Sequence, residues 1–241
     1  MDSYQNEIQA LCSRLKLGCA IPSMLPELST SEHQIIHKVL VATDEQRNLV
    51  ALSRRLKRAK LNTSKSLAVY EFGNFEQPVR LSREEMIGCE FVRNAENLIF
   101  FGSPGTGKTH LANALGIEAC KLKFNVCFYS TSEFVSVLTE TFKAGDLPAF
   151  LRNLSRLDLL ILDEWGYLPL EPVGAQLLFR VISEFYENKS IILTTNLAFS
   201  EWDKIFNDKK LTGAILDRMI HHSHFIQFSG ESYRIAHSLM G

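Results

Sequence analysis

The sequence lacks a long apolar run, a paired-cysteine motif and a dominant charge, and each absence narrows the class of protein. No segment of about 18 consecutive apolar residues occurs, so a transmembrane helix is not expected. The N-terminal segment is polar and has no apolar core of a signal peptide, so we expect a cytoplasmic chain without a membrane partner. The 241 residues carry 26 basic and 27 acidic side chains, which is an ordinary globular composition.

Cysteines are few and do not suggest a disulfide framework or a zinc site. There are five, an odd number, and no two are spaced as CxxC. We expect all of them to be buried free thiols in a reducing compartment. They are Cys12, Cys19, Cys89, Cys120 and Cys127.

Charge is distributed unevenly along the chain. Residues 1–65 carry a net charge of +4, and residues 66–241 carry −5. Within residues 47–65 there are seven basic side chains and no acidic one, which indicates an anionic partner. We therefore expect a basic N-terminal helical domain, residues 1–65, that binds DNA or a partner, followed by a second domain, residues 66–241.

Two hydrophobic periodicities distinguish these domains. Up to residue 60, apolar residues recur at helical spacing, and Ser31 is the expected N-cap of the second helix. Residues 61–66 read as a turn-rich linker. From residue 97, apolar runs alternate with amphipathic segments, which predicts an α/β fold with five parallel strands flanked by helices. The expected strands cover residues 97–101, 126–130, 157–163, 190–196 and 224–228, and the expected helices cover residues 107–123, 131–142, 173–187 and 212–222.

A phosphate-binding motif follows the first expected strand. Residues 102–109 read GSPGTGKT, which is the pattern G-x-x-x-x-G-K-[ST] between a strand and a helix. The N–H groups of such a loop surround a phosphate, and the helix N-terminus adds a partial positive charge. We expect Lys108 to reach the β- and γ-phosphates of ATP and the Thr109 hydroxyl to bind Mg²⁺.

Two adjacent carboxylates end the third expected strand, in LLILDE. Asp163 is expected to hold the Mg²⁺ ion with its water shell, and Glu164 to polarise the attacking water. A solvent-exposed charge at a strand end is the alternative for Glu164. The phosphate-binding motif earlier in the chain favours catalysis.

Three polar side chains further along are candidates for the same site. Asn196 ends the fourth expected strand, where it would share an edge of the sheet with Asp163 and orient the water, unless it only caps the turn. Arg218 and Arg234 are candidates for stabilising charge on the γ-phosphate, in cis or from a neighbouring subunit, with surface ion pairs as the alternative.

Histidines gather near the same end of the sequence. His221, His222 and His224 have no carboxylate or cysteine at a matching sequence spacing. We therefore expect no metal site among them.

These segments together resemble the IstB-type transposition helpers, the ATPase partners of insertion-sequence transposases. The family is of AAA+ type and is similar to the DnaC-type helicase loaders. The resemblance covers about residues 47–240, although Trp165 stands where Leu is usual and Thr195 where Ser is usual. It is carried by GSPGTGKTHLANALG, LLILDEWGYLPL, ILTTNLAFSEW, ILDRMIHHSHFIQFSGESYR and YEFGNF.

The resemblance implies a five-stranded AAA+ sheet, a small N-terminal helical domain and no C-terminal helical lid. It also implies ATP and Mg²⁺ as cofactors, with Thr109 and Asp163 at the metal. Glu164, Asn196 and an Arg218 acting in trans would be catalytic. Motif and resemblance together place the nucleotide at Gly102, Pro104, Gly105, Thr106, Gly107, Lys108, Thr109, His110, Asp163 and Arg234.

The leading interpretation is an ATPase that assembles on duplex target DNA as an oligomer or filament and presents it to a transposase. A DnaC-type loader of a replicative helicase is the alternative, and DEWGYLPL and FSEW favour the helper. A nucleotide or small-molecule kinase is disfavoured by the Asp163–Glu164 pair with Asn196 and Arg218. A DNA-binding switch without hydrolysis is disfavoured by Glu164.

The basic run is the candidate duplex-binding surface, and a solvated helix face is the alternative. No aromatic residue is interleaved with its charges, so base stacking on single strands is not indicated. The residues are Arg47, Arg54, Arg55, Lys57, Arg58 and Lys60.

Overall fold

The computed structural model describes residues 3–72, 75–76, 80–230 and 232. The chain divides into two compact units, residues 1–54 and 55–241. The division falls within helix α3 (Thr30–Arg58), before the turn-rich linker. The functional boundary at residue 65 stays a prediction.

The first unit is helical, as the N-terminal periodicity predicts. Its core is made by apolar side chains of the first helices and of α3. Ser29 and Glu32 form reciprocal contacts at the start of α3, where the Ser29 N–H donates to Glu32 Oε2 at 2.8 Å and the Glu32 N–H to Ser29 Oγ at 3.4 Å. The prediction that Ser31 is the cap is therefore wrong, because the helix starts one residue before Ser31. Besides α3, the unit contains α1 (Ser3–Leu15), α2 (Ala20–Met24) and the 3-10 helix η1 (Leu25–Glu27).

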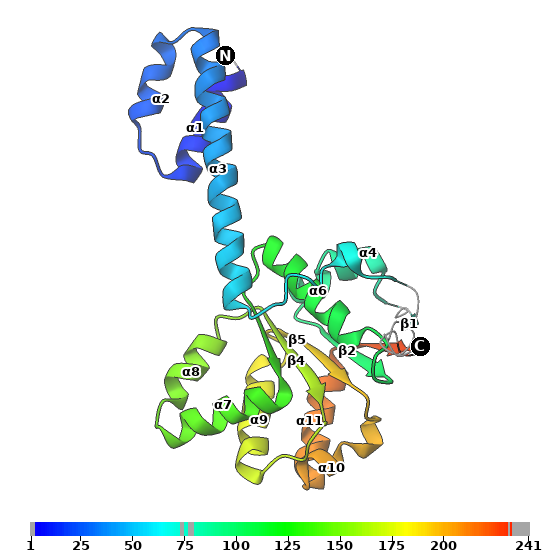
Figure 1. The fold of residues 1–241 in the computed structure, drawn as a ribbon. Coiled ribbons are helices and arrows are strands. Elements are labelled where there is room, and N and C mark those ends of the chain that lie inside the picture. The colour runs from blue at the N-terminus through cyan, green and yellow to red at the C-terminus, as the bar shows by residue number, and fades with distance from the viewer. Residues whose placement is uncertain (1–2, 73–74, 77–79, 231, 233–241) are drawn as a thin grey trace. The chain divides into compact units, whose positions relative to one another are not determined.

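The second unit is built on one sheet, whose strand order is β1-β6-β2-β5-β4-β3 (Figure 1). Five strands are parallel, and β1 (Phe75–Glu76) pairs antiparallel with β6 at the edge. The predicted five-stranded parallel sheet is confirmed, and the short edge strand is an addition. The parallel strands are β2 (Asn97–Gly102), β3 (Val126–Ser130), β4 (Leu159–Trp165), β5 (Ser190–Thr195) and β6 (Ser223–Phe228).

Helices cover both faces of this sheet, so its central strands are buried on both sides. Leu160 and Leu162 of β4 point into a core shared with α7 (Thr131–Lys143), α9 (Pro172–Phe185) and α11 (Lys209–His221). Ile161 points the other way, to α6 (Lys108–Lys121), where a Cβ on Gly116 would lie 2.8 Å from its Cδ1. Successive side chains of β4 point to opposite faces of the sheet, and both faces are covered by helices. The strand therefore has an uninterrupted run of apolar residues.

The main helices match the predicted ones to within a few residues at either end. Helix α11 starts earlier than expected because Asp208 caps it, accepting from the N–H groups of Lys210 and Leu211 at 2.8 and 3.1 Å. Several short helices were not predicted. They are α4 (Arg83–Ile87), α5 (Glu90–Arg93), α8 (Leu147–Leu154), α10 (Asp203–Phe206), η2 (Leu67–Val69) and η3 (Phe199–Glu201).

Two expected absences concern the helices. None of the helices in the described ranges has the length and apolar character to cross a bilayer. Past β6, the described residues Ser229, Gly230 and Ser232 form no helix.

Candidate nucleotide site

The phosphate-binding loop lies between β2 and α6, as its sequence predicts. Gly107 is the N-cap of α6 with φ +97, in the left-handed region that glycine adopts without a steric penalty. A Cβ on Gly107 would meet the Tyr70 ring at 3.3 Å, so the loop backbone lies directly against that ring. The loop therefore needs glycine here both for its turn and for this close approach.

Lys108 lies across the loop and is nearly buried. Its Nζ donates to the carbonyl oxygens of Gly102 at 2.6 Å and Ser103 at 2.7 Å. These contacts hold the ammonium group against the first two residues of the loop. The role of Lys108 in binding phosphate stays a prediction.

Thr109 and Asp163 are brought together from α6 and β4. Thr109 Oγ1 donates to Asp163 Oδ1 at 2.9 Å, and the Asp163 side chain is buried. Hydroxyl and carboxylate oxygens are the hard donors that Mg²⁺ prefers, so this pair fits the predicted metal role by its chemistry. The structure thus brings together the two residues that were predicted at the metal, although 53 residues separate them in the sequence.

Glu164 lies at a bulge within β4. The pairing of β4 with β5 shifts register between Leu162 and Trp165, and Glu164 has φ +58. A left-handed conformation is strained for glutamate and is found often at functional sites. Here it turns the carboxylate into solvent while Asp163 stays buried. Adjacent residues thereby have opposite environments, which suits one to hold a cation and the other to meet water.

Three threonine hydroxyls support this bulge, and none of them was predicted to do so. Thr194 Oγ1 donates to Asp163 Oδ1 at 2.5 Å and accepts from the Glu164 N–H at 3.1 Å. Thr131 Oγ1 donates to the Asp163 carbonyl and Thr195 Oγ1 to the Trp165 carbonyl, each at 2.9 Å. The available signal was the pair of hydroxyls in the otherwise apolar run SIILTTN.

Asn196 follows β5, and β5 lies between β2 and β4. The residue is therefore at the edge of the sheet that also carries the phosphate-binding loop and Asp163. Its side chain is exposed. The position agrees with the predicted one, and its role in orienting water stays a prediction.

Of the two candidate arginines, Arg218 lies within the part of the chain that the structure describes. Arg218, on α11, donates to the Ala214 carbonyl at 2.9 Å, and its guanidinium carbon lies 4.9 Å from the centre of the Phe179 ring on α9. It is thus held against its own helix and α9. Arg234 lies outside the described residues.

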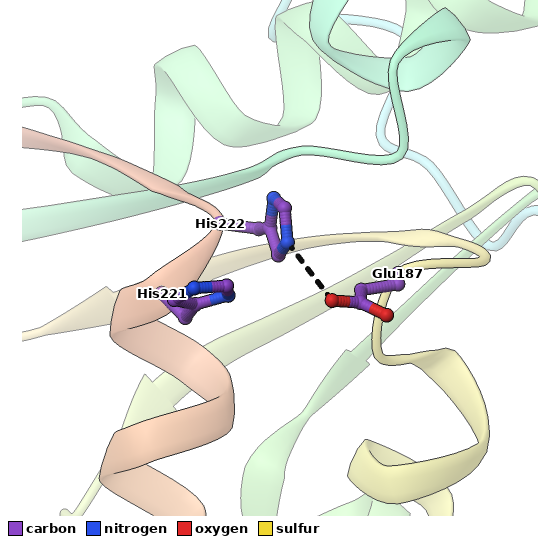
Figure 2. Close-up of side chains that lie close together, drawn as sticks. All are labelled: Glu187, His221 and His222. Atoms are coloured by element: carbon purple, nitrogen blue, oxygen red, sulfur yellow. Dashed lines mark hydrogen bonds and ion pairs between the residues drawn. The ribbon is translucent and has the colours of Figure 1, made fainter.

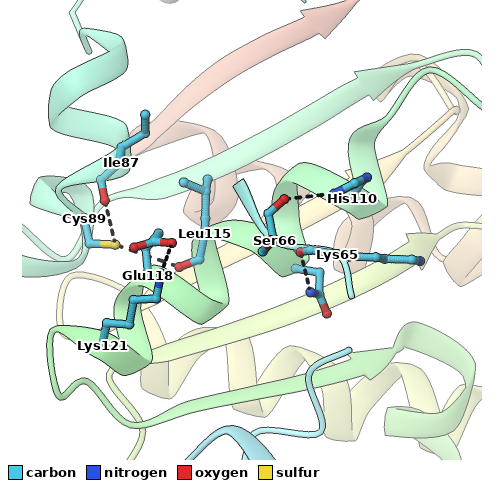
Figure 3. A network of polar contacts seen from close by, with 9 residues as sticks. Lys65, Ser66, Ile87, Cys89, His110, Leu115, Glu118 and Lys121 are labelled. Carbon is cyan, nitrogen blue, oxygen red and sulfur yellow. Dashed lines mark hydrogen bonds and ion pairs between the residues drawn. The ribbon is translucent and has the colours of Figure 1, made fainter. Parts of the chain in front are cut away.

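His110 supports the linker that precedes the sheet (Figure 3). Its Nε2 lies 3.2 Å from the Ser66 carbonyl oxygen, so this ring nitrogen is the donor. The Tyr70 ring packs edge-on against the imidazole at 5.1 Å. Asn113 of α6 adds two donors, to the carbonyls of Asn62 and Lys65 at 2.8 and 3.0 Å. The residues predicted as a plain linker are therefore fixed to the helix of the phosphate-binding loop.

Burial has a clear effect on the pKa values of Tyr70 and of two thiols. It raises the pKa of Tyr70 to about 12, so the phenol beside Gly107 is neutral at physiological pH. It raises the pKa of Cys89 to about 12 and of Cys120 to about 11. The expectation of buried free thiols holds for these two and for Cys12, whereas Cys127 is half-buried and Cys19 is exposed.

The predicted DNA-binding residues separate into two groups. Arg47, in the first unit, donates to the Leu15 carbonyl at 2.7 Å. In the second unit, Arg55 donates to the Cys120 carbonyl at 3.1 Å, and Lys60 pairs with Glu133 at 2.7 Å. These three have structural contacts. Exposed cations with no ion pair among the described residues are Arg54 of the first unit and Lys57 and Arg58 of the second.

Comparison with known proteins agrees with this geometry. The family described as IstB-like ATP binding protein matches residues 24–240. A Pseudomonas aeruginosa protein, named for ATP binding in insertion sequence IS21, is 37% identical over 95% of this chain and 89% of its own. A Geobacillus stearothermophilus protein, named in the same way for insertion sequence IS5376, is 32% identical over 96% and 94%.

Solved structures share the fold. The DnaC helicase loader matches with a TM-score of 0.56 and 24% identity over 69% of this chain and 98% of its own. DnaA from Aquifex aeolicus bound to AMPPCP matches with a TM-score of 0.57 and 24% identity over 72% and 53%. The AAA+ type of sheet expected from the sequence is confirmed.

Proposed function

Because this chain belongs to the IstB-like ATP binding protein family, we propose that it hydrolyses ATP with Mg²⁺ and uses the nucleotide cycle to hold duplex DNA and present it to a transposase. The observation that carries the proposal is the placement of Thr109, Asp163 and Glu164 at one edge of the sheet. The relatives' names support the ATP and the insertion-sequence context.

Nucleotide binding is assigned to the loop. Its backbone N–H groups and the N-terminus of α6 receive the phosphates, and Lys108 adds a positive charge beside them. Thr109 and Asp163 would hold Mg²⁺, which when bound neutralises charge on the phosphate oxygens. The neutral Tyr70 ring lines the loop next to Gly107.

Hydrolysis is assigned to Glu164 as the base for the attacking water. Its carboxylate is exposed beside the buried Asp163, and Asn196, which follows the neighbouring strand, would orient the same water. Arg218 would stabilise the transition state of a neighbouring subunit, since its contacts in its own subunit are with Ala214 and Phe179.

Duplex binding is assigned to the exposed cations of the basic run. Phosphate contacts by Arg54, Lys57 and Arg58 give little sequence preference, and an ATP-dependent oligomer sums them by avidity. The transposase is the partner that the insertion-sequence context suggests.

The test is recovery of a transposase on duplex-coated beads. The full chain, ATP and Mg²⁺ are incubated with the transposase of the same insertion sequence, and Lys108→Ala is the matched control. We expect recovery only with the unaltered chain and ATP. Recovery without nucleotide would overturn the ATP requirement. If the chain preferred single-stranded DNA and captured a hexameric helicase, the proposal of a transposition helper would be wrong, and a helicase loader would be the better assignment.

A further inference from the structure

Two adjacent histidines at the end of α11 lie beside a glutamate from the turn after α9 (Figure 2). His222 Nε2 is 3.2 Å from Glu187 Oε1. One ligand atom from each of Glu187, His221 and His222 lies within 4.8 Å of the others. Two imidazoles and a carboxylate are a common ligand set for Zn²⁺ and related divalent transition metals.

The fold supplies the carboxylate that the local sequence lacks. The expectation of no metal site rested on the absence of an acidic residue at ligand spacing from His221 and His222. Glu187 comes from a different element and reaches both histidines through the packing of α9 against α11. His224 is not part of the group, because its Nε2 lies 2.9 Å from Glu96.

The backbone at Glu187 and a hydrogen bond to His221 support the grouping of these three side chains. Glu187 has φ +58, a left-handed turn that directs its side chain back toward α11. Tyr186 Oη lies 2.9 Å from His221 Nδ1, which leaves Nε2 of that ring for a metal. A hydrogen bond on the second ring nitrogen is the usual way in which a metal-binding histidine is oriented.

Distances also fit a small tetrahedral ion. With metal–ligand bonds of about 2.1 Å, ligand atoms lie about 3.4 Å apart, and the His222–Glu187 pair is already close to this separation. The ligand atom of His221 lies within 4.8 Å of those of the other two residues. All three side chains reach solvent, so water can fill the fourth position.

We propose that Glu187, His221 and His222 form a binding site for a divalent transition-metal ion of the Zn²⁺ class. The ion joins the α9–β5 turn to the end of the helix that carries Arg218. The site is distinct from the Thr109–Asp163 pair, whose oxygen donors suit Mg²⁺.

Co²⁺ titration of the full chain, followed by displacement with Zn²⁺, tests the proposal. We expect visible absorption of a tetrahedral nitrogen–oxygen site without thiolate charge-transfer bands. Glu187→Gln combined with His222→Gln should lower the affinity for both ions by at least about tenfold. The matched control is His224→Gln, which removes an imidazole that also pairs with a glutamate.

Two results would overturn the site. One is unchanged Co²⁺ and Zn²⁺ affinity in the double variant. The other is thiolate bands in the unaltered chain, which would place the ion on cysteine. Circular dichroism of each metal-free variant checks folding, and the single variant Glu187→Gln, with the same expected loss, replaces the double variant if that one unfolds.

Discussion

Thr194 contacts both carboxylate residues of the nucleotide site, through the side chain of Asp163 at 2.5 Å and the backbone N–H of Glu164 at 3.1 Å. The hydroxyl donates its one proton to the first and accepts a hydrogen bond from the second. It therefore links the orientation of the predicted cation ligand to the left-handed backbone of the predicted base. We assign Thr194 as a positioning residue, because it acts through its two neighbours.

Replacing Thr194 by valine keeps the shape of the side chain and removes both contacts. The partly buried N–H of Glu164 then loses this hydrogen bond, and the loss costs about 1 kcal/mol of folding free energy. We expect kcat for ATP to fall about tenfold or more, while ATP affinity changes little, since the loop is untouched. Steady-state hydrolysis and nucleotide titration measure the two quantities. Thr194→Ser should retain activity, and equal kcat values for the valine and serine variants would contradict the assignment.

Lys108 and Glu164 should separate binding from hydrolysis. Lys108→Ala removes the cation held by the loop carbonyls, so tight ATP binding should be lost. Glu164→Gln keeps the size of the side chain but not its basicity, so ATP should bind and turn over slowly. Fluorescent-nucleotide titration and phosphate release distinguish the two. Turnover of the glutamine variant at the unaltered rate would show that Glu164 is not the base.

A trans role for Arg218 predicts complementation between subunits. Arg218→Ala should bind ATP normally and hydrolyse it poorly. Mixing it with Lys108→Ala should restore part of the activity, because one composite site then has both an intact loop and an intact arginine. Hydrolysis is followed across mixing ratios, with co-assembly checked by size. Co-assembly without recovery at any ratio would argue against the trans role.

Thiol reactivity should follow burial and pKa. Cys19 is exposed, whereas burial raises the pKa of Cys89 to about 12 and of Cys120 to about 11. A raised pKa means that the thiolate is scarce near neutral pH, so alkylation is slow. With iodoacetamide at about pH 8, mass spectrometry should find Cys19 modified first, and all cysteines modified in denaturant. Early modification of Cys89 in the native chain would contradict its buried position.

Local sequence patterns predicted most of the fold and the nucleotide-binding loop. The strand in LLILDE is recognisable because both of its faces are buried, and the loop because its glycines and Lys108 occur at fixed spacing. Features that depend on contacts between distant segments were not predictable in the same way. The short strand β1 forms only through β6, and α8 has too few residues for a clear periodicity.

The same distinction applies to the sites. Asp163 and Glu164 were recognised from their position at a strand end, but their support by Thr131 and Thr194 needs three elements packed together. Likewise, Glu187 joins the histidines only through tertiary structure. Charge patterning identified the basic run, but the structure was needed to separate Arg55 and Lys60, whose partners are distant in the sequence, from the cations that have no such partner among the described residues.

Duplex binding should depend on those exposed cations. Lys57→Glu with Arg58→Glu reverses two charges of the second unit that have no ion pair among the described residues, so ATP-dependent duplex binding should be lost while nucleotide binding remains. If Arg54, Lys57 and Arg58 each neutralise one phosphate, the slope of log affinity against log salt is about −2.7 per subunit. Electrophoretic mobility shifts at several salt concentrations measure both effects.

The charge-matched control is Lys143→Glu with Arg152→Glu, two exposed residues of α7 and α8. Loss of binding in the control variant alone would assign the DNA-binding surface to α7 and α8 of the second unit, because reversal of the same number of charges would then matter only there.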